Sequence, residues 1–142
     1  MTDGNTKLAK FTVSTKGHTD IIDITDEVAE IINKSEVKSG IACVFVSGST
    51  ASISTLEFEP NVIKDVKKAL EKLAPAGGDY EHHKTWHDDN GSAHVRACLM
   101  KPGITVPFEN RKLLLGKWQQ IVLIDFDTRP REREIIIQIA GN

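Results

Sequence analysis

The sequence has no strong imbalance of charge and no long apolar run. Lys and Arg together number 18 against 20 Asp and Glu, which gives a net charge of -2. Such a balance provides no general attraction for nucleic acid or an anionic membrane. No segment approaches the roughly 20 consecutive apolar residues of a membrane-spanning helix, and the amino-terminal residues do not resemble a signal peptide. We therefore expect a cytoplasmic protein that binds neither nucleic acid nor a membrane.

Familiar catalytic and ligand-binding motifs are also missing, and cysteine is scarce. The sequence contains no HExxH, CxxC, P-loop or GxGxxG pattern. Its two cysteines, Cys43 and Cys98, lie within the apolar runs IACVFV and VRACLM. Free cysteines in such runs behave as small hydrophobic residues, so we expect two reduced core thiols. A disulfide or a nucleophilic thiol is the alternative.

Length and hydrophobic pattern predict a single domain over residues 1–142. A chain of 142 residues buries roughly two thirds of its unfolded surface, enough for one core. We expect strands at 8–15, 40–46, 51–58, 95–100, 104–108, 113–115, 121–126 and 135–139, and helices at 25–34 and 60–73. This order predicts an α+β fold with a largely antiparallel sheet and two main helices packed on one side. The apolar segment 40–46 is expected at the centre of the sheet, buried on both faces.

The stretch from Asp79 to Leu99 holds most of the titratable side chains that could do chemistry. Four of the five histidines lie there, at positions 82, 83, 87 and 94. The stretch includes a long connection, residues 75–92, and ends in the predicted strand 95–100. Long ordered loops on a rigid scaffold often carry function. We therefore expect one wall of a pocket here.

Three residues could form a metal site: His82, His94 and Glu57. Two imidazole nitrogens and a carboxylate oxygen are ligands that zinc accepts, and they would leave one position open for water or substrate. Glu57 shares a face of the predicted strand 51–58 with apolar Ile53, so its carboxylate either has a buried partner or faces water at an edge. The adjacent His82 and His83 would point apart on an extended backbone, so their spacing neither supports nor excludes a metal site that includes His82.

Six further residues could hold a phosphorylated ligand with a planar ring: Ser49, Thr50, Arg96, Trp118, Gln119 and Arg133. The two hydroxyls follow the predicted strand 40–46, where backbone N–H groups can also bind an anion. The arginines offer forked donors that match phosphate oxygens. The tryptophan could stack on a ring whose edge the glutamine would hydrogen-bond. The alternative is a core tryptophan beside a paired amide.

The order of these motifs resembles the YjbQ family, also called uncharacterised protein family 0047. The similarity runs from about Phe11 to Gly141 and is carried by the segments 40–60, 94–99 (HVRACL), 105–107 (TVP), 115–119 (LGKWQ) and 131–133 (RER). It implies a compact α+β fold that forms homotrimers. It also implies secondary thiamine-phosphate synthase activity, which joins a pyrimidine diphosphate to a thiazole phosphate. The matching site residues are Ser49, Thr50, Glu57, His82, His94, Trp118, Gln119 and Arg133.

One position departs from the family pattern. Many relatives have a histidine that opens a His-Thr-Thr motif, where this chain has Gly48 before Ser49 and Thr50. A role of that histidine would be vacant here or would fall to His83 or His87, which we otherwise expect to face solvent.

The residues and the resemblance together predict a small-molecule enzyme. His94 would be the general acid/base, and Glu57 would orient it or bind a metal. The expected cofactor is a divalent metal, either Mg²⁺ with the substrate or Zn²⁺ at the histidines. The alternative is a non-catalytic or regulatory module that captures a small phosphorylated metabolite.

Overall fold

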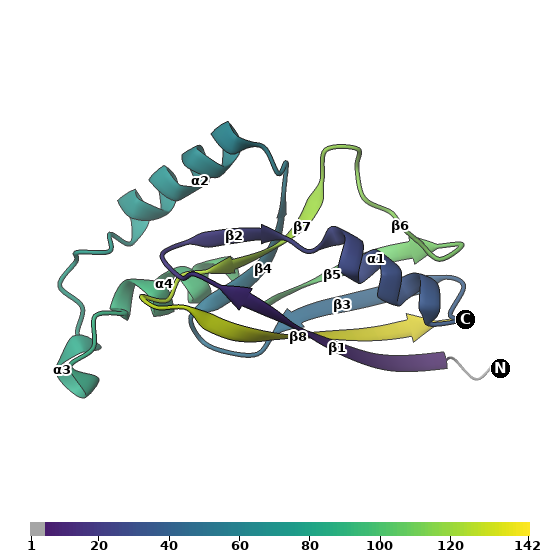
Figure 1. The fold of residues 1–142 in the computed structure, drawn as a ribbon, viewed down its shortest axis with the longest axis horizontal. Helices are drawn as coiled ribbons and strands as arrows, with labels where there is room; N and C mark the ends of the chain where they lie inside the picture. Colours follow the sequence, from purple (N-terminus) through teal and green to yellow (C-terminus); the bar gives the residue numbers. More distant parts are fainter. Residues whose placement is uncertain (1–4) are drawn as a thin grey trace.

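Two antiparallel sheets form the framework of the computed structural model, which describes residues 5–142 (Figure 1). The larger sheet has the order β1 (Asn5–Thr15), β8 (Arg131–Gly141), β3 (Gly40–Val46), β5 (Gly103–Glu109) and β6 (Lys112–Leu113). The smaller has the order β2 (Asp20–Asp23), β7 (Gln120–Asp125) and β4 (Ala51–Leu56). The helices are α1 (Thr25–Lys34), α2 (Pro60–Leu73), α3 (His83–Trp86) and α4 (Gly91–Met100). The predicted α+β class with antiparallel sheets is confirmed.

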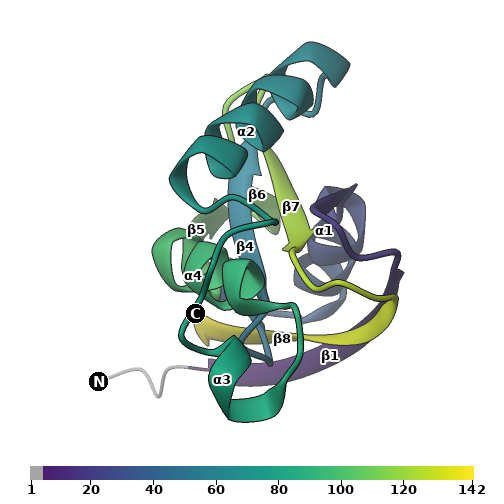
Figure 2. The same cartoon turned by 90° about the vertical axis from the view of Figure 1, so that its left-hand side faces the viewer.

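Strand β7 separates two hydrophobic cores because it is apolar on both faces. Ile121 and Leu123 pack in the first core with α1 and the larger sheet, whereas Val122 and Ile124 pack in the second with α2 and α4. Successive side chains of a strand point to opposite faces, so the run IVLI serves both cores. Figure 2 accordingly shows α4 and α1 on opposite sides of β4 and β7.

Strand β3 is the middle strand of the larger sheet, as its apolar sequence predicts. The prediction that both its faces are buried is wrong. Ala42, Val44 and Val46 are fully buried, but Ile41 is 50% and Phe45 39% exposed on the opposite face. Neither hydrophobic core of the described residues includes Ile41 or Phe45.

The segment 95–100 is helical, so the predicted strand there is wrong. It forms the greater part of α4, whose buried Ala93 and Ala97 stand four residues apart and face the second core. Ser52 on β4 donates to the carbonyl of Ala97 at 3.4 Å. A short apolar run suits a strand and a buried helix equally well, and packing against β4 and β7 decides for the helix.

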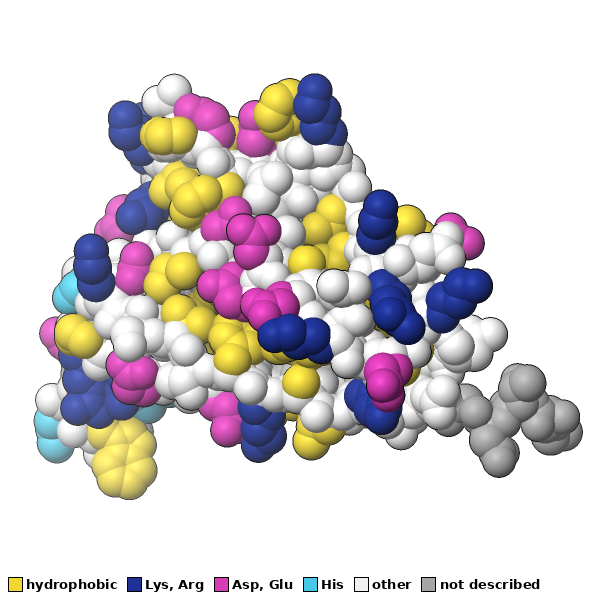
Figure 3. All heavy atoms as spheres, turned by 45° about the vertical axis from the view of Figure 1, so that its right-hand side comes forward, with side chains coloured by type: hydrophobic (Ala, Val, Ile, Leu, Met, Phe, Trp, Pro, Cys, Tyr) yellow, Lys and Arg dark blue, Asp and Glu magenta, His cyan; other side chains and the backbone are white. Residues whose placement is uncertain are grey.

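One of the two cysteine thiols is accessible at the surface. Both cysteines are free, but Cys98 is exposed and Cys43 only half-buried, so their predicted place in the core is wrong. On the face in Figure 3, acidic side chains gather near the middle, basic ones lie mostly toward the two edges, and hydrophobic ones lie between them. Within residues 5–142, none of the helices is long and apolar enough to cross a bilayer.

Candidate functional site

Helix α4 presents His94 to a small cleft. The cleft has a volume of about 250 Å³ and is lined by Gly48, Ser49, Ala51, His94, Ala97, Cys98 and Pro102. Ser49 is exposed just before β4 begins, and His94 and Cys98 lie one helical turn apart. The cleft therefore brings a hydroxyl, an imidazole and a thiol to the same surface.

His82 lies directly against His94. The two ring centroids are 4.4 Å apart, with the ring planes tilted by 58°. On its other side, His82 Nε2 is 3.5 Å from Asp88 Oδ1. Two of the four histidines of the stretch from Asp79 to Leu99 thus form a pair.

The environment of His94 favours its neutral form. Burial lowers the pKa of His94, and the neighbouring His82 lowers it further; the carboxylates of Asp127 and Asp88 oppose this but do not reverse it. A pKa below the usual 6.5 leaves the imidazole unprotonated at neutral pH. His94 is therefore able to accept a proton from a molecule bound in the cleft.

His83 supports the loop. The prediction that its side chain faces solvent is wrong. Its ring is half-buried, packs edge-on against Tyr80, and accepts a hydrogen bond from the backbone N–H of Gly91 at 3.1 Å. A Cβ on Gly91 would lie 2.5 Å from the Tyr80 Cβ, so only glycine fits where α4 begins. His87 is exposed, as predicted.

Arg133 and Thr50 belong to a buried polar network beside the cleft. Arg133 donates through Nε and Nη2 to both carboxylate oxygens of Asp125, at 2.7 and 2.8 Å. Nη2 also donates to Thr50 Oγ1 at 2.8 Å, and this hydroxyl donates to Asp127 Oδ2 at 3.1 Å. All four side chains are buried. The Arg133 guanidinium and the Thr50 hydroxyl, both predicted to contact a ligand, are thus bonded to other side chains of the protein.

The two aspartates of this network were missed by the sequence analysis. Burial acts to raise the pKa of Asp125, but hydrogen bonds from Arg133 and Thr15 hold it below the usual value. For Asp127 burial again acts upward, while bonds from the Thr128 amide, Arg131 and Thr50 keep its pKa low. Both are therefore ionised inside the protein. An acidic residue at the end of the apolar run IVLID was the available signal.

Arg96 lies on the other side of α4 from His94. Its Nε donates to the carbonyl of Ala74 and its Nη1 to Thr19 Oγ1, both at 2.9 Å. Nη2 donates to Glu71 Oε2 at 2.6 Å. The guanidinium joins α4 to α2 and to the β1–β2 connection, and it does not line the His94 cleft.

Glu57, Trp118 and Gln119 lie at the far end of β4. His94 adjoins Ala51, and six residues of extended strand span about 20 Å. Glu57 is exposed, which agrees with the alternative of an edge carboxylate in water. Trp118 is 63% exposed, so the alternative of a core tryptophan is wrong. Gln119 donates to Thr55 Oγ1 at 3.2 Å.

The predicted metal ligands do not come together in the described chain. Across residues 5–142, no group of three or more His, Cys, Asp or Glu side chains is arranged to hold a metal ion. His82 and His94 are adjacent, but Glu57 lies beyond β4. A zinc site made of these three residues thus does not fit a single chain.

Gly48 has a backbone conformation that a histidine would not readily adopt. Its φ is +140°, and a Cβ built there would lie 3.1 Å from Arg133 Nη1. L-amino acids with a side chain rarely occupy this region. The backbone at position 48 therefore suits glycine and not the histidine that the family resemblance implies there.

Comparison with known proteins gives one consistent result. A family model described as "UPF0047 protein YjbQ-like" matches residues 9–142. A UPF0047 protein of Archaeoglobus fulgidus is 35% identical over 91% of this chain and 98% of its own length. The UPF0047 protein YugU of Bacillus subtilis is 31% identical over 94% and 99%, respectively. A crystal structure from Sulfolobus solfataricus, titled a YbjQ-like protein of unknown function, has a TM-score of 0.91 and 32% identity, covering 98% of this chain and 99% of its own.

Proposed function

The chain belongs to the YjbQ-like UPF0047 family, and we propose that it is a small-molecule enzyme in which His94 transfers a proton. The observation that carries this proposal is the half-buried, neutral imidazole of His94, which lies against His82 and opens onto the Ser49 cleft. A neutral imidazole can remove a proton from a bound ligand and return it as imidazolium, so one residue can serve as base and acid.

The proposed reaction is the one that the family resemblance implies: the ring nitrogen of a thiazole phosphate forms a C–N bond to the methylene carbon of a pyrimidine diphosphate while the C–O bond to the diphosphate group breaks, and diphosphate leaves. In the His94 cleft the chain offers its phosphate contacts at the Ser49 hydroxyl and the adjacent backbone N–H groups, because Arg96 does not line this cleft and Arg133 is bonded to Asp125 and Thr50. The Arg133 network instead fixes the start of β4 from behind through Thr50. A Mg²⁺ ion would enter with the diphosphate and neutralise its charge.

The direct test is to incubate the purified protein with both precursors and Mg²⁺ and to measure thiamine phosphate by mass spectrometry. We expect product that accumulates with time and protein concentration. A bound precursor raises the free energy of unfolding by RT ln(1 + [L]/Kd) and so raises the melting temperature. If a precursor has this effect while product is absent, the protein is a binding module and the enzymatic proposal fails. Absence of both effects would reject this ligand class.

We further propose that the protein is a homotrimer whose sites combine residues of two subunits. Exposed apolar side chains support self-association: Val95 and Leu99 on α4 are 39% and 57% exposed, and Ile41 and Phe45 protrude from β3. A second copy of the chain would remove this apolar surface from water. It would also offer a way for the far end of β4, with Glu57 and Trp118, to reach the His94 cleft of a neighbour.

Mixing two inactive variants tests this composite site. His94→Gln and Glu57→Gln subunits should each be inactive alone. Co-expressed, they should regain activity at about a quarter of the sites, because each contributing residue is wild type in half of the subunits. The measurement is the activity of the oligomer fraction after size-exclusion chromatography has separated it from monomers. A mixture of His94→Gln with the double variant is the inactive control, and a mixture without recovery would show that the sites do not combine subunits.

A further inference from the structure

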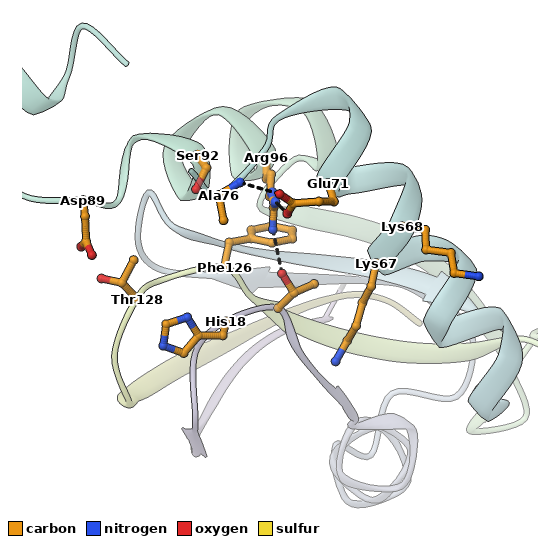
Figure 4. Close-up of a pocket in the computed structure, with 11 residues that line it drawn as sticks. His18, Lys67, Lys68, Glu71, Ala76, Asp89, Ser92, Arg96, Phe126 and Thr128 are labelled. Atoms are coloured by element: carbon orange, nitrogen blue, oxygen red, sulfur yellow. Dashed lines mark hydrogen bonds and ion pairs between the residues drawn. The ribbon is translucent and has the colours of Figure 1, made fainter. Parts of the chain in front are cut away.

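A second cavity lies on the side of α4 opposite His94. Its volume is about 490 Å³, and its walls come from α2, α4, the β1–β2 connection and the segment that follows β7. Figure 4 shows Phe126 and Arg96 between Lys67 and Lys68 on one side and His18, Thr128 and Asp89 on the other. Cavities that bind small molecules are commonly of this size. None of the chemistry proposed for His94 uses this space.

One side of the cavity is basic. Lys67 and Lys68 line it from α2, and neither forms an ion pair with any described side chain. Glu71, the acid of α2 that lines the same cavity, is already bonded to Arg96 and to the backbone N–H of Ala76. Two ammonium groups are therefore free to meet an anion.

Arg96 adds a fixed donor to the cavity. Its side chain is only 5% exposed and is held by bonds to Ala74, Thr19 and Glu71. A guanidinium carries five N–H groups, so these three bonds leave others available to a ligand. Because the protein already positions this side chain, a ligand would lose little affinity in ordering it.

The opposite wall is held in an uncommon backbone conformation. His18 and Thr19 have φ values of +55° and +63°. A positive φ is costly for β-branched threonine, which is buried here. The bond from Arg96 to Thr19 Oγ1 and a bond from the His18 N–H to the Asp127 carbonyl, at 2.7 Å, hold this conformation. The cavity wall is thus a defined surface of the protein.

We propose that this cavity binds a small organic anion, a phosphate or carboxylate attached to a planar ring. Lys67 and Lys68 provide the positive charge for the anionic group, and Arg96, whose own charge is paired with Glu71, provides further N–H donors. Phe126 supplies an aromatic surface for the ring, and Ser92 and Thr128 supply hydroxyls for polar groups on its edge. This second site is independent of the proposed reaction, because it uses the other face of α4.

Calorimetric titration with phenyl phosphate, benzoate and uncharged phenol tests the site. We expect the wild-type protein to bind at least one of the two anions, and to bind phenol more weakly. The double variant Lys67→Gln/Lys68→Gln should weaken the binding of that anion by at least about tenfold, because two charge-assisted contacts are lost. The tighter of the two anions identifies the acidic group that the site prefers.

The matched control is Lys64→Gln/Lys72→Gln, which removes the same charge from exposed positions of α2 outside the cavity. It should change the affinity less than about twofold, since distant surface charges are screened by salt. Equal weakening by both double variants, equal binding of phenol, or failure of both anions to bind would overturn the proposal. Retained binding in His94→Gln would separate this site from the proposed active site, and lost binding there would overturn their independence.

Discussion

Replacement of Asp125 by asparagine is expected to lower the free energy of unfolding by about 3–5 kcal/mol, because it removes the carboxylate that pairs with both Nε and Nη2 of the buried Arg133 and leaves the more distant Asp127, 3.8 Å from Nη2. Asp125 is fully buried and accepts hydrogen bonds from Arg133, Thr15 and the backbone N–H of Asp127. Asparagine has nearly the same shape but carries no charge. Urea denaturation at pH 7 measures the difference.

The control is Glu134→Gln, which breaks the exposed ion pair with Lys10 on the larger sheet. That change should cost no more than about 0.5 kcal/mol.

The lowered pKa of Asp125 and Asp127 adds a pH dependence: their contribution is complete above the unfolded value of 3.8 and is lost as the pH falls below it. Asp125→Asn should flatten this acid limb. A denaturation midpoint equal to that of Glu134→Gln would contradict the role of the network.

Replacement of His94 by glutamine is expected to reduce product formation by about 10²- to 10⁴-fold, the range usually lost with a general acid/base. Glutamine keeps a polar side chain of similar size but cannot carry a proton between substrate and solvent. The rate of product formation at saturating precursor and Mg²⁺ is the measurement. Because His94 is half-buried at the surface of α4, the variant should keep the wild-type fold, which circular dichroism can check.

The matched control for this change is His87→Gln, because His87 is exposed and does not line the cleft. It should retain wild-type activity. If His94→Gln were as active as His87→Gln, His94 would not be the proton-transfer residue. If both lost activity equally, the effect would come from the loop as a whole.

The family and the fold class could be predicted from the sequence because their signals are local. Successive apolar segments predict antiparallel strands, and the run IVLI of β7 is apolar on both faces because two cores meet there. The helix α4 could not be predicted, since Val95–Met100 is too short for its apolar pattern to distinguish strand from helix. Its Ala93 and Ala97 become decisive only when they pack against β4 and β7.

The site was harder to predict because its residues are partnered across the fold. Arg133 on β8 meets Asp125 on β7, and Arg96 on α4 meets Glu71 on α2, contacts between elements of different sheets or helices. A sequence shows a free arginine in both cases. The separation of Glu57 from Ser49 was predictable, however, because an extended strand joins them and about 20 Å exceeds the span of one small cleft.

The central claim, that His94 is a neutral proton acceptor beside His82, is tested most directly by its NMR titration in the folded protein. Comparison with His94→Gln assigns the signal. We predict a midpoint below 6.5, because burial and His82 both lower the pKa of His94, and a shift back toward 6.5 in His82→Gln. A midpoint at or above 6.5 in the wild-type protein, unmoved by His82→Gln, would contradict it.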